Sequence, residues 1–215
     1  MTVIVFMPTR IKNCGLTTLA SIDCAITSGA AFVGFVHHEP SPRHVSLAQM
    51  TALRAHAASL IKTVAVLVNP TDELLATIAT EVKPHFIQLH QVADGARIQS
   101  IEARFGIPII TVISVKSPSD LTHIAAFEEI SAHLLFDAPV AGSGHAFDWS
   151  LLKNLPLRKK WFLAGGLTAE NVGQAIRITH APMVDVSSGI EESLGVKSLE
   201  KIASFNQAVL SAAHA

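Results

Sequence analysis

The feature that most constrains the fold of this chain is an alternation of two patterns that begins at Thr9 and continues to the C-terminus. One pattern is a short, nearly continuous apolar run, which is typical of a parallel strand buried on both faces. The other is a longer segment with apolar residues at helical spacing. The apolar runs predict eight strands, at Thr9–Cys14, Phe32–Val36, Lys62–Val68, Phe86–Leu89, Ile109–Ile113, Leu134–Asp137, Trp161–Ala164 and Met183–Val186.

The segments between these runs carry signals for helix ends. Ser46 followed by Gln49 predicts a capping box at a helix start. Gly29 stands where a left-handed C-cap would end a helix. Thr168 is expected to cap the helix that follows the seventh strand. After the sixth strand, residues 147–152 leave room for little more than a helical turn.

Strict alternation of strands and helices requires parallel strands joined by right-handed crossovers. Eight units in 215 residues leave about 25 residues for each unit, close to the ~200-residue lower limit of a (β/α)8 barrel. We therefore expect an α/β protein that forms a single (β/α)8 TIM barrel over residues 1–215, with a short N-terminal extension at 1–8. A doubly wound open sheet is the competing architecture.

The position of polar residues favours the closed barrel. Cys14, His90, Asp137 and Asp185 lie at or just past the ends of predicted strands. The carboxyl ends of all strands in a closed barrel meet at one mouth, where the active sites of such enzymes lie. These four side chains are therefore expected to converge.

Composition excludes several classes of protein. Sixteen Lys and Arg against seventeen Asp and Glu give a net charge of −1, which argues against a nucleic-acid partner. A hydrophobic content of 49% with 15% charged residues excludes a disordered chain. The apolar stretch at 1–7 is far shorter than the ~20 residues of a membrane span. Two cysteines are too few for a disulfide framework, so a cytoplasmic protein without a membrane partner is expected.

Two glycine-containing turns are candidate phosphate sites. Gly165 and Gly166 follow the seventh strand, and Ser187, Ser188 and Gly189 follow the eighth. Such turns expose backbone N–H groups, and the loops after strands seven and eight are the usual phosphate site of a barrel. The alternative is that these glycines only form tight turns.

Three further residues are candidates for chemistry, each with an alternative. Cys14 is either a reactive thiol or ordinary packing, and Asp137 either enters the site or caps a turn. Arg43 could bind a carboxylate through two hydrogen bonds, or be a solvated loop residue. The adjacent residues at 37–39, His-His-Glu, cannot easily point at one ion, so no metal site is predicted.

Taken together, these segments resemble the phosphoribosylanthranilate isomerases of tryptophan biosynthesis over nearly the whole chain from Thr9 onward. The resemblance rests on the order of several motifs: Lys12-Asn13-Cys14-Gly15-Leu16-Thr17, Gly29-Ala30, Gly34-Phe35, Ser41-Pro42-Arg43, Ile87-Gln88-Leu89-His90-Gln91, Leu134–Asp137, residues 142–149, residues 163–172 and residues 184–191.

The resemblance implies a (β/α)8 enzyme that carries out an Amadori rearrangement of N-(5'-phosphoribosyl)anthranilate without a cofactor or a metal. It assigns Asp137 as the general acid that protonates the ring oxygen, and Cys14 as the general base that removes the C2' proton. Arg43 would hold the anthranilate carboxylate, and Asp185 would orient the reacting end. Gly165, Gly166 and the turn of Ser187, Ser188 and Gly189 would hold the phosphate. We also expect His90 to bind substrate, and it is the next candidate if Cys14 is not the base.

The sequence also departs from the family pattern. Asn13 replaces an aliphatic residue, so one inward position of the first strand is expected to be polar. Gln91 replaces a glycine, His145 stands where Lys, Glu or Gln is common, and the loop between Asp137 and Gly142 is short. This short loop puts substrate affinity and rate in question more than the type of reaction.

Two other readings remain from the sequence. One is a barrel that binds a phosphorylated metabolite without converting it, and the other is a different phosphosugar enzyme, such as a pentose-phosphate epimerase or a tryptophan synthase α subunit. Retention of both Cys14 and Asp137 favours the isomerase over a binding protein. A monomer or a homodimer is expected.

Overall fold

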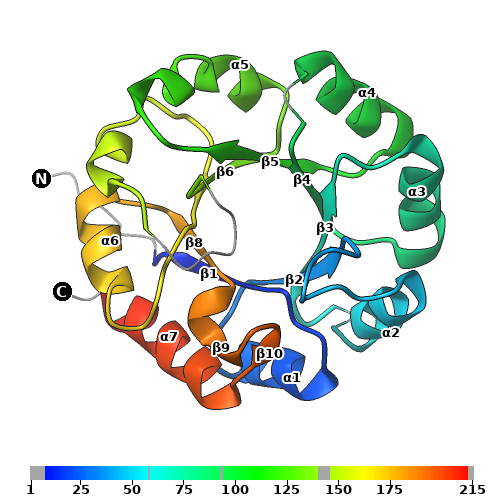
Figure 1. Ribbon diagram of the computed structural model, residues 1–215, viewed down its shortest axis with the longest axis horizontal. Coiled ribbons are helices and arrows are strands. Elements are labelled where there is room, and N and C mark those ends of the chain that lie inside the picture. The colour runs from blue at the N-terminus through cyan, green and yellow to red at the C-terminus, as the bar shows by residue number, and fades with distance from the viewer. Residues whose placement is uncertain (1–7, 58, 93, 140–145, 213–215) are drawn as a thin grey trace, which may run out of the picture.

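The structure, a computed structural model, describes residues 8–57, 59–92, 94–139 and 146–212. Its eight parallel strands pair in sequence order, and the first pairs with the last, which closes the sheet into a barrel (Figure 1). The strands are β1 (Arg10–Cys14), β2 (Phe32–His37), β3 (Lys62–Val68), β4 (Phe86–His90), β5 (Ile109–Ser114), β6 (His133–Asp137), β7 (Phe162–Leu163) and β8 (Met183–Val186). The expected (β/α)8 barrel is confirmed, and the open sheet is excluded.

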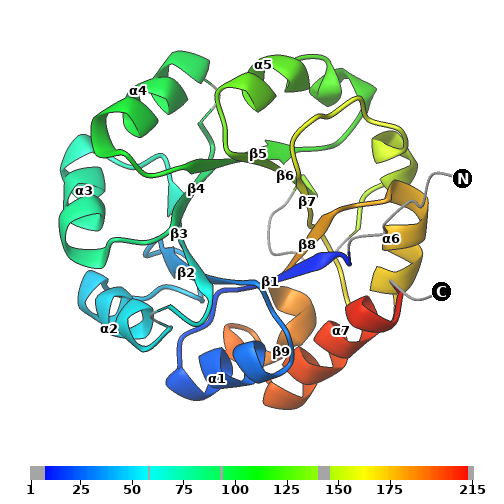
Figure 2. The ribbon, with the colours of Figure 1, turned by 180° about the vertical axis from the view of Figure 1, so that it is seen from behind.

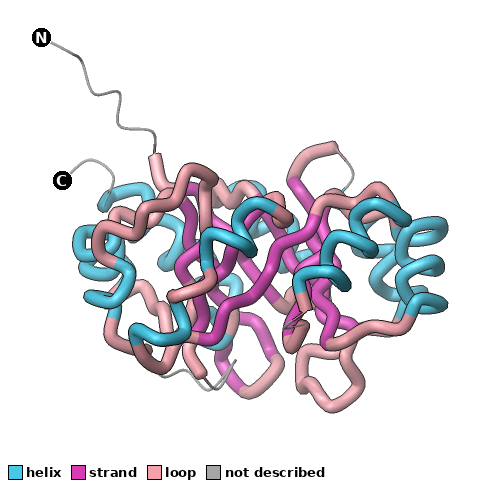
Figure 3. The backbone as a smooth tube through the Cα atoms, turned by 90° about the horizontal axis from the view of Figure 1, so that it is seen from above, coloured by secondary structure: helices cyan, strands magenta, loops and turns pink. Residues whose placement is uncertain are grey.

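Helices surround the strands on the outside of the barrel, as the views from its two ends and from the side show (Figures 1, 2 and 3). The α-helices of the described residues are α1 (Leu19–Thr27), α2 (Leu47–Ala57), α3 (Asp72–Thr77), α4 (Gly95–Phe105), α5 (Ile124–Glu129), α6 (Val172–Thr179) and α7 (Leu199–Ala212). A π-helical turn at Ile78–Val82 extends α3, and a 3-10 helix at Pro118–Leu121 precedes α5.

Two connections differ from the simple strand–helix alternation. A 3-10 helix at Trp149–Leu152 is the helical element between β6 and β7 in the described residues, which confirms the expectation of little more than a turn. After β8, a 3-10 helix (Ser188–Ile190) and a small antiparallel hairpin of β9 (Glu191–Ser193) and β10 (Val196–Lys197) precede α7.

Local sequence signals set several helix ends as predicted. The Ser46 N–H donates to Gln49 Oε1 at 2.9 Å and the Gln49 N–H donates to Ser46 Oγ at 3.2 Å, which is the predicted capping box before α2. Gly29 has a φ of 91° just past the end of α1, and its N–H donates to Ile26 O. Glycine adopts this left-handed conformation with the least strain, because it has no Cβ.

The predicted cap at Thr168 is wrong. Helix α6 begins only at Val172, and Asn171 is the residue that organises the turn before it. Its Oδ1 accepts from the Thr168 N–H at 2.8 Å, and its Nδ2 donates to Gly166 O at 2.8 Å. Because this turn stands between the glycine pair and α6, Thr168 lies one turn before the helix rather than at its start.

Apolar side chains fill the barrel, so it has a packed interior instead of a pore. At its centre the Phe32 ring makes edge-to-face contacts with Phe86 and Phe162, with ring centroids 5.9 and 5.2 Å apart. A larger apolar layer lies between the strands and the helices. The interior cluster below the mouth includes Phe32, Val36, Val64, Val66, Ile110, Leu135, Phe162 and Met183.

The side chain of Asn13 does not take the inward position expected for it. It is fully buried between the barrel and α7, where its amide exchanges two hydrogen bonds with Asn206, of 3.0 and 3.1 Å. Successive strand residues point to opposite faces of a sheet, and Lys12 and Cys14 take the inward positions of β1. The polar replacement is therefore matched by a partner in the helical layer and does not enter the mouth.

Candidate active site

Six of the predicted site residues line one cavity at the carboxyl ends of the strands. They are Cys14, Arg43, His90, Asp137, Asp185 and Ser187. The cavity measures about 340 Å³, within the range of roughly 300–1,000 Å³ of small-molecule sites. Residues more than 100 positions apart in the sequence meet here because barrel closure brings all strand ends together.

Lys12 lies beneath this cavity, fully buried, and its Nζ donates to Asp185 Oδ1 at 2.8 Å. Burial alone would lower the pKa of Lys12, but the negative charge of Asp185 and the nearby Cys14 raise it overall. A Cβ added to Gly34 would lie 2.9 Å from Cys14 Sγ and 3.2 Å from Lys12 Nζ. The thiol and the ammonium therefore share the space that this glycine leaves, and Lys12 carries a positive charge at the base of the cavity.

Cys14 ends β1 and is 5% exposed. Burial raises the pKa of its thiol, and Asp185 adds to this effect, while the positive charges of Lys12 and Lys197 lower it. The pKa of the thiol stays above its ordinary value overall. The thiolate, which is the form that accepts a proton, is therefore disfavoured, although the two lysines oppose this effect.

Asp137 ends β6, and its Oδ1 accepts from the Ala138 N–H at 2.8 Å. Burial and the charge of Asp185 raise the pKa of this carboxyl to about 6. A raised pKa keeps a proton available near neutral pH, which suits a general acid. The sequence left open whether Asp137 caps a turn or enters the site, and its side chain does both.

His90 ends β4 and its Nε2 lies 2.9 Å from Gln88 Nε2, so the Gln88 amide donates to the ring nitrogen. Burial and the charges of Lys12 and His38 lower the pKa of His90 to about 4. The imidazole is therefore neutral at pH 7. Gln88 Oε1 is buried and accepts no hydrogen bond from the described part of the chain, although Gln88 lines the cavity.

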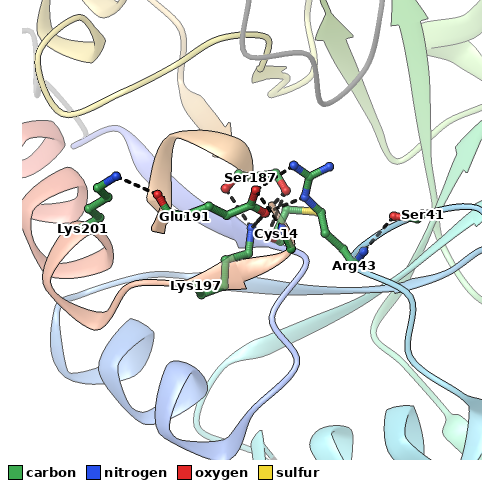
Figure 4. A network of polar contacts seen from close by, with 8 residues as sticks. Cys14, Ser41, Arg43, Ser187, Glu191, Lys197 and Lys201 are labelled. Carbon is green, nitrogen blue, oxygen red and sulfur yellow. Dashed lines mark hydrogen bonds and ion pairs between the residues drawn. The ribbon is translucent and has the colours of Figure 1, made fainter. Parts of the chain in front are cut away.

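Arg43 lies in the loop after β2 and is 8% exposed, so it is not a solvated surface arginine. Its Nε donates to Glu191 Oε1 at 2.6 Å and its Nη2 donates to Glu191 Oε2 at 2.9 Å (Figure 4). This pairing raises the pKa of Arg43. The Arg43 N–H also donates to Ser41 Oγ at 3.2 Å. The guanidinium is thus fixed at the edge of the cavity.

The two glycine-containing turns lie against each other. A Cβ on Gly189 would overlap the carbonyl oxygen of Leu167, which follows the Gly165–Gly166 pair. Gly166, Ser188 and Gly189 line a second hollow next to the main cavity. Gly165 is set apart from it, since a Cβ there would lie 2.7 Å from Ala138 N and 3.2 Å from Asp137 Oδ1. The predicted phosphate residues are therefore close together but do not line a single hollow. Ser187 lines the main cavity, Gly166, Ser188 and Gly189 line the second hollow, and Gly165 packs against Asp137 and Ala138.

The site also contains Gln88, Glu191 and Lys197, to which the sequence assigned no role. Glu191 and its partner Arg43 are 148 residues apart, so no local spacing could have paired them. Gln88 stands two residues before His90 in β4, and strand alternation places both on the barrel side. The alternation of side chains along the strand was the one sequence signal that could have identified Gln88 as a site residue.

Fold and site together define a (β/α)8-barrel enzyme with a buried thiol and a carboxyl of raised pKa at the mouth of the barrel. The family model for N-(5'-phosphoribosyl)anthranilate (PRA) isomerase matches residues 11–208. The chain belongs to this family, and it is an isomerase, as the resemblance implied.

Relatives and solved structures agree with this family. The N-(5'-phosphoribosyl)anthranilate isomerase of Beijerinckia indica is 46% identical over 209 residues, which cover 94% of both chains. A crystal structure of a phosphoribosyl anthranilate isomerase in complex with reduced 1-(o-carboxyphenylamino)-1-deoxyribulose 5-phosphate matches with a TM-score of 0.82 at 31% identity, over 94% of this chain and 98% of that one. Monomers generated from the dimeric enzyme of Thermotoga maritima match with a TM-score of 0.82 at 30% identity, over the same shares of the two chains.

The structure also bears on the expectations about a membrane and a metal. No helix in the described ranges is long and apolar enough to cross a membrane. Within those ranges, no group of three or more His, Cys, Asp or Glu side chains could hold a metal ion. His145 and most of the short loop after Asp137 fall in residues 140–145, outside the described residues, as do residues 1–7 of the expected extension.

Proposed function

We propose that this cavity converts N-(5'-phosphoribosyl)anthranilate to 1-(2-carboxyphenylamino)-1-deoxyribulose 5-phosphate by general acid–base catalysis. The observation that carries the proposal is that Cys14, Asp137 and Arg43, from distant parts of the chain, line one cavity. A thiol, a carboxyl of raised pKa and a guanidinium supply a base, an acid and a carboxylate-binding group. A protein that only bound the metabolite would need neither the thiol nor the buried acid.

In the first step Asp137 donates its proton to the furanose ring oxygen, and the bond from that oxygen to C1' breaks. The nitrogen lone pair forms the new double bond, which gives an iminium ion and a ring-opened hydroxyl. A pKa of about 6 for Asp137 makes this transfer possible near neutral pH.

In the second step the Cys14 thiolate removes the C2' proton, and the electrons of that bond move to the iminium nitrogen to give an enolamine. The iminium charge acidifies this proton, so a modest base suffices. The same charge, together with Lys12 and Lys197, lowers the pKa of the thiol when the thiolate is needed. The enolamine then tautomerises to the ketone product without any external oxidant or reductant.

Binding groups surround these two residues. Arg43 would hold the anthranilate carboxylate, while Asp185, fixed by Lys12, and His90 would orient the sugar. Gly166, Ser188 and Gly189 would hold the phosphate through backbone N–H groups, with Ser187 between that hollow and the cavity. A cytoplasmic location and a monomeric or homodimeric state stay predictions.

The test is to replace the acid and the base separately. Cys14→Ala and Asp137→Asn are each expected to lower kcat by roughly 10²–10⁴-fold with smaller effects on KM, because a positioned proton-transfer group contributes about that much. The substrate is made in place from anthranilate and phosphoribosyl pyrophosphate by the transferase, and the loss of its fluorescence is followed. Cys24→Ala is the matched control, because this second cysteine lies in α1 away from the cavity.

Deuterium at C2' separates the two roles. Without the acid, ring opening limits the rate and the isotope effect is expected to be small. Without the base, proton removal limits the rate and the effect is expected to grow. A near wild-type kcat for Cys14→Ala would show that the thiol is packing, and His90 would become the next candidate base.

A further inference from the structure

The hairpin between β8 and α7 touches the loop that carries Arg43. Glu191 begins β9 and Lys197 ends β10. At the turn between these strands, a Cβ on Gly195 would overlap the carbonyl oxygen of Pro42, so the hairpin and the Arg43 loop are in direct backbone contact. The Gly195 N–H also donates to Glu191 Oε2 at 3.3 Å. The hairpin is therefore built against the edge of the cavity.

Glu191 is bound from several sides. Besides Arg43, Lys197 Nζ donates to Glu191 Oε1 at 2.8 Å, and Lys201 Nζ donates to its backbone oxygen at 2.7 Å (Figure 4). The Lys197 ammonium also donates to Ser187 O at 2.8 Å and lies 3.2 Å from Ser187 Oγ. Ser187 Oγ in turn donates to Cys14 O at 3.2 Å. One carboxylate thus connects the Arg43 loop to the residues beside the thiol.

The geometry of the guanidinium sets which of its edges a ligand can use. Glu191 takes the edge formed by Nε and Nη2. The second edge, formed by Nη1 and the other hydrogen of Nη2, makes no hydrogen bond to the described part of the chain. Arg43 also lines the cavity. An arginine can bind one carboxylate on each edge because it has five donors in a rigid plane.

The charges of this cluster leave a place for one anion. Arg43 and Lys197 are cationic and Glu191 is anionic, so the three side chains carry a net charge of +1 in a buried setting. Lys197 supplies its three donors to three acceptors, which is the arrangement that an ammonium requires. A ligand carboxylate on the second edge of Arg43 would make the cluster neutral.

We propose that Glu191 and Lys197 are positioning residues that give the enzyme its selectivity for a substrate with a carboxylate on its aromatic ring. Glu191 holds Arg43 by one edge so that the other is presented to the ring carboxylate, and Lys197 restores the positive charge that Glu191 removes. This inference rests on the proposed function, in which Arg43 binds that carboxylate.

A role in positioning and a simple effect of charge predict opposite results for Glu191→Gln. The substitution removes one negative charge, so the cluster becomes more positive. If only charge mattered, an anionic ligand would bind more tightly. If Glu191 orients the guanidinium, the contact with the ligand carboxylate is lost despite the added positive charge. The NH2 group of the glutamine would face one of the two Arg43 N–H groups that now donate to Glu191, and two donors repel each other.

The experiment compares two ligands, the reduced product analogue with its ring carboxylate and the same compound made from aniline, which lacks it. Titration calorimetry of Glu191→Gln is expected to show at least about tenfold weaker binding of the first ligand and unchanged binding of the second. In steady-state kinetics, KM should rise with kcat within about threefold of wild type. Glu192→Gln, on the exposed neighbour of Glu191, is the matched control and should change neither.

Two further variants complete the test. Glu191→Asp keeps the charge but shortens the reach, so it should show the same selective loss and replaces Glu191→Gln if that variant does not fold. Lys197→Met should also weaken only the carboxylated ligand. In an Arg43→Ala background, Glu191→Gln should add no further selective loss, because it acts through Arg43.

Each failure has a separate meaning. If Arg43→Ala leaves the preference for the carboxylated ligand unchanged, the proposed role of Arg43 is wrong, and this inference is overturned with it. If Arg43→Ala removes the preference but Glu191→Gln keeps or increases it, the proposed function stands and the positioning role of Glu191 is overturned.

Discussion

The pKa values of Cys14 and Asp137 are shifted in the same direction, although one residue is the proposed base and the other the proposed acid. Burial raises the pKa of each group, which favours the neutral form of both. For Asp137 this is useful, because an acid must hold a proton before ring opening. For Cys14 it is unfavourable, because a base must lose its proton first. Lys12 and Lys197 reduce the rise in the thiol pKa in part, and the iminium charge of the intermediate would reduce it further. Lys12 lowers the pKa of both groups, whereas Lys197 acts on the thiol, so the iminium charge has to supply the rest of the shift that the base needs.

The raised pKa of Asp137 predicts that Asp137→Asn is stabilising at neutral pH. The folded-state pKa of about 6 lies above the unfolded value of about 3.9, so the folded state binds more protons between these values. The stability of the wild type therefore falls as pH rises from about 4 through about 6, by up to about 3 kcal/mol. Asparagine keeps the acceptor for the Ala138 N–H without a buried charge.

Urea denaturation at several pH values measures this difference. Asp137→Asn should exceed the wild type in unfolding free energy at pH 8, and the two proteins should converge below pH 4. Asp94→Asn, at the exposed N-cap of α4, serves as the control for removing a carboxylate. Equal stability of wild type and Asp137→Asn at pH 8 would contradict the raised pKa.

The sequence predicted which residues lie at the site where the end of a strand places them there. It could not predict a contact that depends on a partner far away in the sequence. Cys14, His90, Asp137 and Asp185 each end or nearly end a strand, so barrel closure was enough to bring them together. The sequence could not show that one edge of Arg43 is occupied, because its partner lies in the hairpin after the last strand. Roles of all these residues stay predictions.

At the scale of elements, local signals located the strands and the capping box well, since both depend on near neighbours in the sequence. The strands at Lys62–Val68 and Met183–Val186 match their predicted bounds at both ends. The errors at Thr168 and Asn13 share one feature, although strand alternation is what turns Asn13 away from the mouth. In each, an asparagine elsewhere provides the hydrogen bonds, Asn171 in the turn before α6 and Asn206 in α7.

The Asn13–Asn206 pair predicts a double-mutant cycle between β1 and α7. Asn13→Ile leaves Asn206 Oδ1 buried without its donor, and Asn206→Leu leaves both amide groups of Asn13 unpaired. Each single substitution is expected to cost about 1–3 kcal/mol, whereas the double substitution should be close to neutral because no unpaired polar group remains. Denaturant midpoints measure all four proteins.

Ser28 provides an internal check on this cycle. Its Oγ accepts from Asn206 Nδ2 at 2.7 Å but also donates to Cys24 O at 2.6 Å, so it keeps a partner when Asn206 is replaced. A double variant that is as unstable as the sum of the two single variants would show that the pair contributes more than mutual satisfaction.

At the scale of the whole molecule, the barrel is closed by pairing the first strand with the last. Residues Arg10 to Asn13 lie in register with Met183 to Val186, and Lys12 stands directly beside Asp185. Their ion pair crosses this closing seam, with side-chain exposures of 0% and 9%. The same two side chains thus link the first and last strands of the barrel and place an ion pair under the active site.

The seam predicts that stability and activity can be separated. Lys12→Met leaves Asp185 as an uncompensated buried charge and is expected to cost about 3–5 kcal/mol, as is Asp185→Leu for the converse reason. The double variant Lys12→Met/Asp185→Leu replaces the pair by apolar groups and should recover most or all of that loss, since such replacements are often neutral or stabilising by about 1–4 kcal/mol. Its kcat should nevertheless remain low for two reasons: the sugar has lost Asp185, its proposed orienting residue, and Lys12 lowers the pKa of Cys14 by more than Asp185 raises it. Chemical denaturation and steady-state rates on the same preparations test both halves, and a double variant that is stable and fully active would show that the pair serves closure alone.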